Sequence, residues 1–413
     1  MERDCTPSGG GPTKRFHIAD ESEILSGRTT DVYFQRTEEV LQAEGKDEEP
    51  VVAEVTTGQL PQGWPWGIFC GLEEAIKLLE GRPLDLYALP EGTLFSPRSH
   101  GGVRVPVAVL DGPYGTFARY ETPLLGLLCQ ATAIATKAAR VKRAAGPLEV
   151  TSFGVRRMHP ALAPMIDRAA YVGGLDAVSS LLGADLIGEA PQGTMPHALT
   201  IVLGGPEEAF RAYDRRTEAG VPRIALVDTY LDEVREALLA AESIPDLTGV
   251  RLDTPGSRRG DFPEIVRQVR WELDQRGYEG VKIYTSGGLD EENIPDLAAA
   301  GAVGFGVGTS VSDAPTINFA LDIVEVDGRP AAKRGKYSGR KDVFRCPNDL
   351  TYEVGSSSPP CPQCQGTMED VLVQYLEAGK LVADLPSPRE IRKSVLAQLS
   401  RLSESQGKPE KVD

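Results

Sequence analysis

Two glycine-rich turns in the second half of the chain have the composition of a phosphate cradle. They contain Ser286, Gly287 and Gly288 in one case and Gly306, Gly308 and Thr309 in the other. Each turn follows an apolar segment that reads as a β-strand, so backbone N–H groups at the strand end can point at an anion. The glycines match neither a P-loop nor a dinucleotide-binding fingerprint. They indicate a phosphate site of another kind, with simple tight turns as the alternative.

Two carboxylates and an arginine follow the preceding pair of predicted strands. Asp228 ends the first of these strands, and Arg251, Asp253 and Thr254 end the second. Carboxylates at such positions can hold ribose hydroxyls or a hydrated Mg²⁺, and the arginine can bind a phosphate. The alternative role for both aspartates is to cap a helix N-terminus.

An aromatic ring lies close in the sequence to two guanidinium groups. Phe153 is followed by Arg156 and Arg157. A flat ring beside arginines suits an aromatic carboxylate as a ligand. A core phenylalanine next to two surface arginines is the alternative, which this segment alone leaves open.

Three cysteines near the C-terminus have the spacing of a zinc ribbon in which one cysteine is replaced. Cys346 is followed after two residues by Asp349, and two residues also separate Cys361 from Cys364. This spacing predicts a structural Zn²⁺ with Asp349 as the fourth ligand, or a site that has lost its metal. The other three cysteines are scattered, which favours a reduced, cytoplasmic protein over a disulfide framework.

The composition excludes several classes of protein. The 413 residues carry 44 Lys and Arg against 60 Asp and Glu, a net charge of −16 at pH 7. So acidic a chain is unsuited to nucleic acid or an anionic membrane, and an anionic ligand must meet a local cluster of arginines. The sequence has no run of 18 apolar residues and no N-terminal apolar core. We therefore expect neither a transmembrane helix nor a secretory signal.

Six apolar segments after residue 147 each end in a polar or glycine-rich loop. They cover 148–152, 184–187, 223–227, 249–252, 281–284 and 302–305. This rhythm predicts parallel strands with helical crossovers. We favour a (β/α) barrel because the polar residues are spread over all six loops, whereas a doubly wound sheet would gather them at a switch point.

Changes in this rhythm suggest how the chain divides. The predicted segments are a flexible tail at 1–14, an α/β domain at 15–122, the barrel at 123–313, a return to the first domain at 314–400 with a knuckle at 346–364, and a second tail at 401–413. A helix predicted over 123–145 opens the barrel domain. Thr122 can cap this helix, and Gly146 can end it.

As a set, the motifs resemble the nicotinate phosphoribosyltransferases, a family of type II phosphoribosyltransferases. The resemblance runs from about residue 20 to about residue 390. It rests on Thr30-Asp31-x-Tyr33, Glu121-Thr122-Pro123-Leu124-Leu125, Ser152-Phe153-Gly154-x-Arg156-Arg157, Gly193-Thr194-Met195-Pro196-His197, Arg251-x-Asp253-Thr254-x-Gly256 and Gly304-Phe305-Gly306-Val307-Gly308-Thr309. It implies an N-terminal α/β domain followed by an incomplete or irregular (β/α) barrel.

The resemblance also implies a reaction, in which nicotinate and phosphoribosyl pyrophosphate (PRPP) give nicotinate mononucleotide and pyrophosphate in NAD synthesis. Such a transfer depends on positioning and on stabilising the charge of the leaving diphosphate with Mg²⁺ and arginine. The candidate catalytic residues are His197, Arg251 and Asp253. In the family this histidine is transiently phosphorylated by ATP, although Pro196 stands here where many members have a smaller residue.

By the same resemblance, the active unit is an obligate homodimer or a higher homo-oligomer with shared active sites. Tyr33 of one subunit and Phe153 of the other would sandwich the pyridine ring. Arg156, Arg251, Asp253 and the two glycine turns would hold the phosphoribosyl group. The family also often carries a small zinc knuckle near the cysteines.

Nicotinamide and quinolinate are the alternative substrates. Asp185 lies in the stretch where nicotinamide-using relatives place an aspartate that accepts the amide, whereas Arg156 and Arg157 favour a carboxylate. Outside the enzyme class, the cysteine segment could make the chain a non-catalytic binding protein on an inactive barrel. The acidic net charge and the intact site residues argue against that interpretation.

Overall fold

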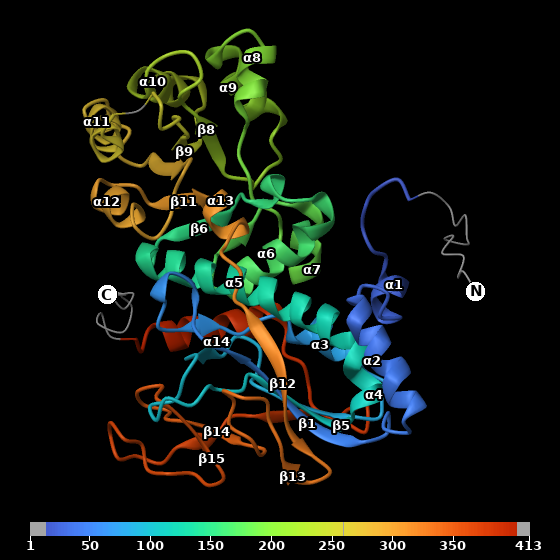
Figure 1. Cartoon of the computed structure of the whole chain (residues 1–413). Helices are drawn as coiled ribbons and strands as arrows, with labels where there is room; N and C mark the ends of the chain where they lie inside the picture. The colour runs from blue at the N-terminus through green and yellow to red at the C-terminus, as the bar shows by residue number, and fades with distance from the viewer. Residues whose placement is uncertain (1–13, 259, 403–413) are drawn as a thin grey trace.

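Residues 14–258 and 260–402 are described in a computed structural model, in which two β-sheets lie on either side of one long helix (Figure 1). The first sheet has seven strands, and neighbouring strands pair antiparallel. In spatial order these strands are β13 (Arg329–Pro330), β12 (Phe319–Val326), β1 (Pro50–Thr57), β5 (Ala108–Pro113), β3 (Asp85–Ala88), β17 (Val373–Glu377) and β18 (Lys380–Leu381). The chain after residue 314 therefore runs back into the sheet that the N-terminal part begins.

The second sheet has six strands, and all of its pairs are parallel. In spatial order these strands are β7 (Ala177–Val178), β6 (Glu149–Ser152), β11 (Gly304–Val307), β10 (Lys282–Ser286), β9 (Leu247–Leu252) and β8 (Arg223–Leu226). Around the barrel, strands β6 to β11 follow one another in the order of the sequence, and β11 pairs with β6. The barrel is open between β7 and β8, which do not pair. The predicted (β/α) barrel is thus confirmed in the incomplete form that the resemblance implied, and a doubly wound sheet is excluded.

One predicted barrel strand is wrong. Residues 184–187 belong to helix α7 (Leu181–Ile187), and the strand at this point of the barrel is β7. The hydroxyl of Ser180 accepts a hydrogen bond from the Gly183 amide at 3.1 Å, which caps the helix N-terminus. A short apolar run is compatible with a buried helical segment and with a strand, and here the N-terminal cap favours the helix.

Helix α5 (Glu121–Ala145) contributes side chains to both hydrophobic cores. Ala138 packs into the core of the parallel sheet, and Leu128 packs into the core of the antiparallel sheet. The hydroxyls of Thr132 and Thr136 accept hydrogen bonds from the backbone amides of Cys70 and Ile68. The helical stretch 114–145 is long and apolar enough to span a membrane, but 67% of its most apolar window is buried inside the protein, as in a core helix.

The start of α5 differs from the prediction, although its end at Gly146 is as expected. The helix follows directly from a 3-10 turn over Ala118–Tyr120, so Tyr120, already in a helical conformation, takes the N-cap position. Thr122 is no cap. Its hydroxyl instead donates to the Asp31 carboxylate at 2.9 Å and accepts from the Asp31 amide at 3.3 Å.

The remaining elements surround the two sheets. The N-terminal helices are α1 (Glu21–Leu25), α2 (Val32–Ala43), α3 (Leu72–Leu79) and α4 (Tyr114–Phe117). The other helices of the barrel half are α6 (Ala163–Val172), α8 (His197–Val202), α9 (Pro206–Arg216), α10 (Glu233–Ser243), α11 (Phe262–Asp274), α12 (Ile294–Ala299) and α13 (Thr309–Ser312). The α-helices and β-strands of the described residues are completed by a small sheet of β15 (Tyr352–Gly355), β14 (Asp342–Arg345) and β16 (Glu369–Asp370), by the pair β2 (Gly67–Ile68) and β4 (Leu94–Phe95), and by helix α14 (Pro388–Leu399).

The domain boundaries placed at 122/123 and 313/314 stay predictions. The two predicted tails fall almost wholly on residues 1–13 and 403–413, which lie outside the described residues.

The contact between α5 and α6 leads to a stability prediction. A Cβ at Gly173 would collide with the Ala135 carbonyl of α5. Gly173→Ala should therefore lower the free energy of unfolding by about 1–3 kcal/mol. Gly126→Ala is the matched control, because Gly126 is exposed within α5 and a Cβ there would meet no atom within 4 Å, and it should raise stability by up to about 1 kcal/mol. Equal midpoints of thermal unfolding for the two variants would contradict this close packing.

Candidate active site

A cavity of about 650 Å³ opens at the carboxyl ends of the parallel strands. Twelve of the residues predicted from the sequence line it: Phe153, Arg156, Arg157, His197, Arg251, Asp253, Ser286, Gly287, Gly288, Gly306, Gly308 and Thr309. The structure thus brings together in one place the predicted glycine turns, the arginines and the aromatic ring. The carboxyl ends of barrel strands are where this architecture places its chemistry.

Three predicted site residues do not line the cavity. Tyr33 lies on α2 with 56% of its surface exposed. Asp228 lies behind Asp253, and one of its carboxylate oxygens accepts the Asp253 amide hydrogen bond at 3.0 Å. The Thr254 hydroxyl donates to Glu233 at 2.5 Å. The latter two residues therefore support the loops around the cavity from behind.

Eight further residues line the cavity that we did not select as site residues: Val155, Ser179, Thr194, Met195, Pro196, Leu289, Asp290 and Ser310. Thr194, Met195 and Pro196 belong to the motif that ends in His197, which is the signal that could have found them. Ser179 follows a strand of only two residues, too short to recognise by periodicity.

Arg251 connects the loops that surround the cavity. Its Nε donates to Thr194 Oγ1 and its Nη1 donates to Ser286 Oγ, each at 2.8 Å. Its Nη2 donates to the Met195 carbonyl oxygen at 3.1 Å. Asp253 Oδ2 lies 3.6 Å from the guanidinium, and Asp253 Oδ1 accepts from Ser286 Oγ at 2.8 Å. Burial lowers the pKa of Arg251 and the neighbouring carboxylates oppose this, so the guanidinium remains a cation.

The imidazole of His197 lies between a hydroxyl and two carboxylates. Nδ1 is 3.1 Å from Thr229 Oγ1, and Nε2 is 3.7 Å from Asp253 Oδ2 and 3.9 Å from Asp228 Oδ1. Asp228 is 2% exposed, and burial raises its pKa to about 6 while His197 opposes the rise. Asp228 Oδ1 is buried without a hydrogen-bond partner among the described residues. A buried carboxylate oxygen of this kind favours a nearby positive charge.

Two positions at the cavity require glycine, one for space and one for its backbone conformation. A Cβ at Gly306 would collide with the ring of Phe153, so only glycine leaves the ring in place. The ring lies 5.8 Å from the guanidinium carbon of Arg251, within range of a cation–π contact. Gly287 has a φ of +89°, a conformation that strains any residue with a side chain.

Buried carboxylates fix two of the strand-end loops. Asp167 of α6 accepts hydrogen bonds from the hydroxyls of Ser152 and Ser180 and from the Ser180 amide. Glu236 of α10 accepts hydrogen bonds from the amides of residues 229–231, in the loop that follows β8. Both carboxylates are completely buried, so each loop is held by groups that water does not reach.

The exposed position of Asp185 bears on substrate choice. Asp185 lies on α7 and is absent from the cavity lining. It is therefore not placed to accept an amide from a ligand in the cavity.

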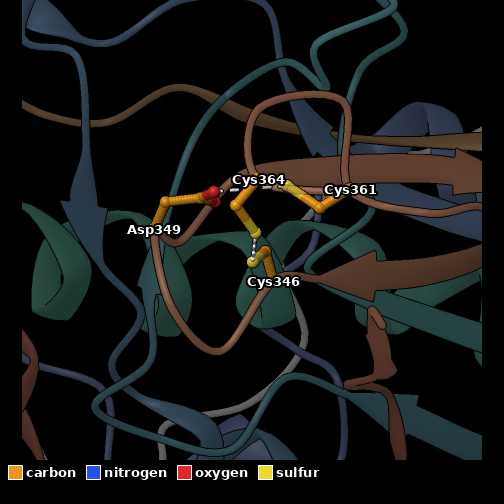
Figure 2. A group of neighbouring side chains, drawn as sticks. All are labelled: Cys346, Asp349, Cys361 and Cys364. Atoms are coloured by element: carbon orange, nitrogen blue, oxygen red, sulfur yellow. Dashed lines mark hydrogen bonds between the residues drawn. The ribbon is translucent and has the colours of Figure 1, made fainter. Parts of the chain in front are cut away.

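The predicted zinc ligands form a second cluster, which follows all the cavity-lining residues in the sequence (Figure 2). The ligand atoms of Cys346, Asp349, Cys361 and Cys364 all lie within 4.8 Å of one another. Cys346 Sγ is 3.5 Å from Cys364 Sγ, and Cys361 Sγ is 3.2 Å from Asp349 Oδ2. The four residues converge as a tetrahedral metal site requires.

The two halves of this cluster have the same turn. Each half begins with Cys-Pro, and the residue after its second ligand has a positive φ, 61° at Leu350 and 60° at Gln365. The amides of Leu350 and Gln365 donate to the carbonyls of Cys346 and Cys361. Paired turns of one conformation, each carrying two ligands, fit a zinc knuckle.

Comparison with known proteins agrees with this geometry. Residues 31–132 match the family described as quinolinate phosphoribosyl transferase, N-terminal domain, and residues 134–322 match its C-terminal domain. A nicotinate phosphoribosyltransferase of Mycobacterium tuberculosis is 31% identical over 430 residues and 92% of each chain is covered. That of Bacillus subtilis is 30% identical, with 78% of this chain and 74% of the relative covered.

Solved structures agree as well. The nicotinate-nucleotide pyrophosphorylase of Pyrococcus furiosus is 51% identical with a TM-score of 0.90, covering 94% of this chain and 98% of its own. Human nicotinic acid phosphoribosyltransferase has a TM-score of 0.73 at 21% identity, with 92% and 96% covered, which supports the fold alone.

Proposed function

The chain belongs to the nicotinate phosphoribosyltransferase family, and we propose that it forms nicotinate mononucleotide and pyrophosphate from nicotinate and PRPP, as a step of NAD synthesis. The observation that carries this proposal is the cavity itself. Its lining includes two glycine turns and Arg251 as one group of residues, and Phe153 with Arg156 and Arg157 as another. One part suits a phosphorylated sugar, and the other suits an aromatic carboxylate.

The reaction breaks the bond between C1 of the ribose and the diphosphate oxygen, through a state with oxocarbenium character. The residues of this chain act by position and charge, and no nucleophilic side chain is required. The backbone amides of the glycine turns bind phosphate oxygens, and Arg251 stabilises negative charge that develops on the leaving group. Asp253, with the unpaired Oδ1 of Asp228 behind it, fits a divalent cation. Mg²⁺ held there would neutralise the diphosphate.

Substrate choice gives the direct test of this function. A charge-assisted hydrogen bond from Arg156 or Arg157 to the carboxylate contributes about 1.5–3 kcal/mol. The kcat/KM for nicotinate should therefore exceed that for nicotinamide by at least about tenfold. Arg156→Gln and Arg157→Gln, assayed separately, should show which arginine carries the preference. Equal or better turnover of nicotinamide in a competition assay would contradict the proposal.

Quinolinate is the second candidate substrate, because the family that matches both parts of the chain is described as quinolinate phosphoribosyl transferase. It belongs in the same competition assay. Two arginines at the cavity wall can bind its two carboxylates. The assay with Arg156→Gln and Arg157→Gln therefore also distinguishes quinolinate from nicotinate. Preferred turnover of quinolinate, lost in both variants, would replace nicotinate as the substrate.

We further propose that the active unit is a homodimer with shared sites. Tyr33 is exposed on α2 and does not line the cavity of its own chain. This placement fits the expectation that Tyr33 covers the pyridine ring in the cavity of a second subunit.

We also propose a cytoplasmic location, because the cysteine thiols in the metal cluster need reducing conditions.

ATP is proposed as a co-substrate through His197. An imidazole nitrogen can accept a phosphoryl group, and His197 lies at the cavity wall. We expect His197→Ala to keep a low, ATP-independent transferase rate and to lose both ATP hydrolysis and stimulation by ATP. The exposed His159, absent from the cavity lining, is the matched control, and His159→Ala should keep both.

The outcomes of this test distinguish the phosphohistidine proposal from the transferase assignment. A wild-type protein without ATP stimulation would remove the phosphohistidine proposal and leave the transferase assignment intact. Stimulation that persists in His197→Ala would place the coupling at another group.

Zinc is proposed as a structural ion in the knuckle. Metal analysis of protein purified without chelator should find about one zinc per chain. Cys361→Ser should lose the zinc and speed amide exchange over residues 342–370, with little effect on kcat. Cys129→Ser, outside the cluster, should keep the metal. A zinc-free protein whose stability is indifferent to Cys361→Ser would exclude the site.

A further inference from the structure

Glu291 lies within the loop that carries the first glycine turn, three residues after Gly288, and is absent from the cavity lining. Its carboxylate pairs with two cations of α5. Lys137 Nζ forms a close ion pair with Oε2, and Arg140 Nε lies 3.3 Å from Oε1. The side chains of Glu291, Lys137 and Arg140 are 15%, 11% and 8% exposed. This is a nearly buried cluster of three charges between the cavity loop and the central helix.

Both cations lie over buried tryptophan rings, and Lys137 Nζ is 6.0 Å from the ring centroid of Trp64. The guanidinium carbon of Arg140 lies 5.1 Å from the ring centroid of Trp64 and 5.6 Å from that of Trp66. Both tryptophans are 3% exposed. Because α5 is fixed in both cores, the pair offers Glu291 a rigid anchor.

The loop on which Glu291 lies, residues 287–293, is hydrogen-bonded internally and to the second glycine turn. Asn293 Nδ2 donates to the Gly288 carbonyl at 3.0 Å, and Asn293 Oδ1 accepts the Asp290 amide at 3.1 Å. Ser310, at the second turn, donates from its hydroxyl to the Leu289 carbonyl at 2.7 Å. The loop anchored by Glu291 is therefore bonded to the second turn as well.

The charge on Glu291 is stable. Burial alone would raise its pKa, but the hydrogen bond from Lys137 and the nearby cations hold the pKa below its ordinary value. The carboxylate is thus ionised across the pH range of any assay near neutrality.

We propose that Glu291 is a positioning residue for the binding of PRPP. Its ion pairs with Lys137 and Arg140 hold the two glycine turns at the separation and orientation that a phosphate group requires. This inference rests on the proposed function, because PRPP is the ligand of the turns.

The test compares three variants. Glu291→Gln keeps the shape and removes the charge, Glu291→Asp keeps the charge on a shorter side chain, and Glu292→Gln removes the charge of the exposed neighbour. For Glu291→Gln we expect the KM for PRPP to rise by at least about tenfold, with the KM for nicotinate within about twofold of wild type. Glu291→Asp should recover part of the loss, and Glu292→Gln should behave as wild type.

A readout independent of turnover accompanies the kinetics. Amide hydrogen exchange over residues 287–290 should be faster in Glu291→Gln than in wild type and Glu292→Gln. Inorganic pyrophosphate, used as the probe, should slow exchange there in wild type more than in Glu291→Gln. If Glu291→Gln does not fold, Lys137→Gln takes its place with the same expectations. This variant should fold, because Glu291 keeps Arg140 as a partner.

The contrary results are distinct. A loss of kcat with unchanged KM for PRPP, as a smaller folded fraction would give, or unchanged exchange over 287–290, would overturn the positioning role. A wild-type protein that transfers no phosphoribosyl group would instead refute the proposed function. The pyrophosphate exchange experiment would then still decide whether Glu291 orders the turns.

Discussion

The geometry of the cavity depends on one buried cation, the guanidinium of Arg251. It binds the loop before α8 through Thr194 and Met195, and the end of β10 through Ser286. A guanidinium offers five donors in a fixed plane, so its position sets the positions of the groups it binds. In a chain with a net charge of −16, this local cation also gives an anionic substrate a favourable place to bind.

Buried carboxylates supply the complementary constraint. Carboxyl groups are costly to bury unless hydrogen bonds or opposite charges compensate for lost water. Asp167 and Glu236 meet this condition with loop amides and hydroxyls, and Glu291 meets it with two cations of α5. Loops held in this way do not need to rearrange when a charged ligand arrives. Such preorganisation is what electrostatic stabilisation of a leaving diphosphate requires.

Local sequence signals predicted part of this arrangement. The helix expected over 123–145 is present as α5 and ends at Gly146 as predicted, and the two glycine turns lie at the ends of β10 and β11 as expected. The misplaced strand at 184–187 shows the limit, because a short apolar run fits either conformation. Asp228 was grouped with the cavity since it follows a strand, yet its carboxylate faces the Asp253 amide. Glu291 was missed because its role arises from Lys137 and Arg140, which precede it by more than 150 residues.

The opening in the barrel explains how the cavity obtains part of its wall. A closed eight-stranded barrel would pair strands all around its axis. Here β7 and β8 do not pair, and the chain between them contributes α7 and the segment 188–196. That segment brings Thr194 and Met195 to Arg251 and places His197 at the start of α8, close to the two carboxylates. The chain between the two unpaired strands thus supplies two partners of Arg251 as well as the histidine that faces the carboxylates.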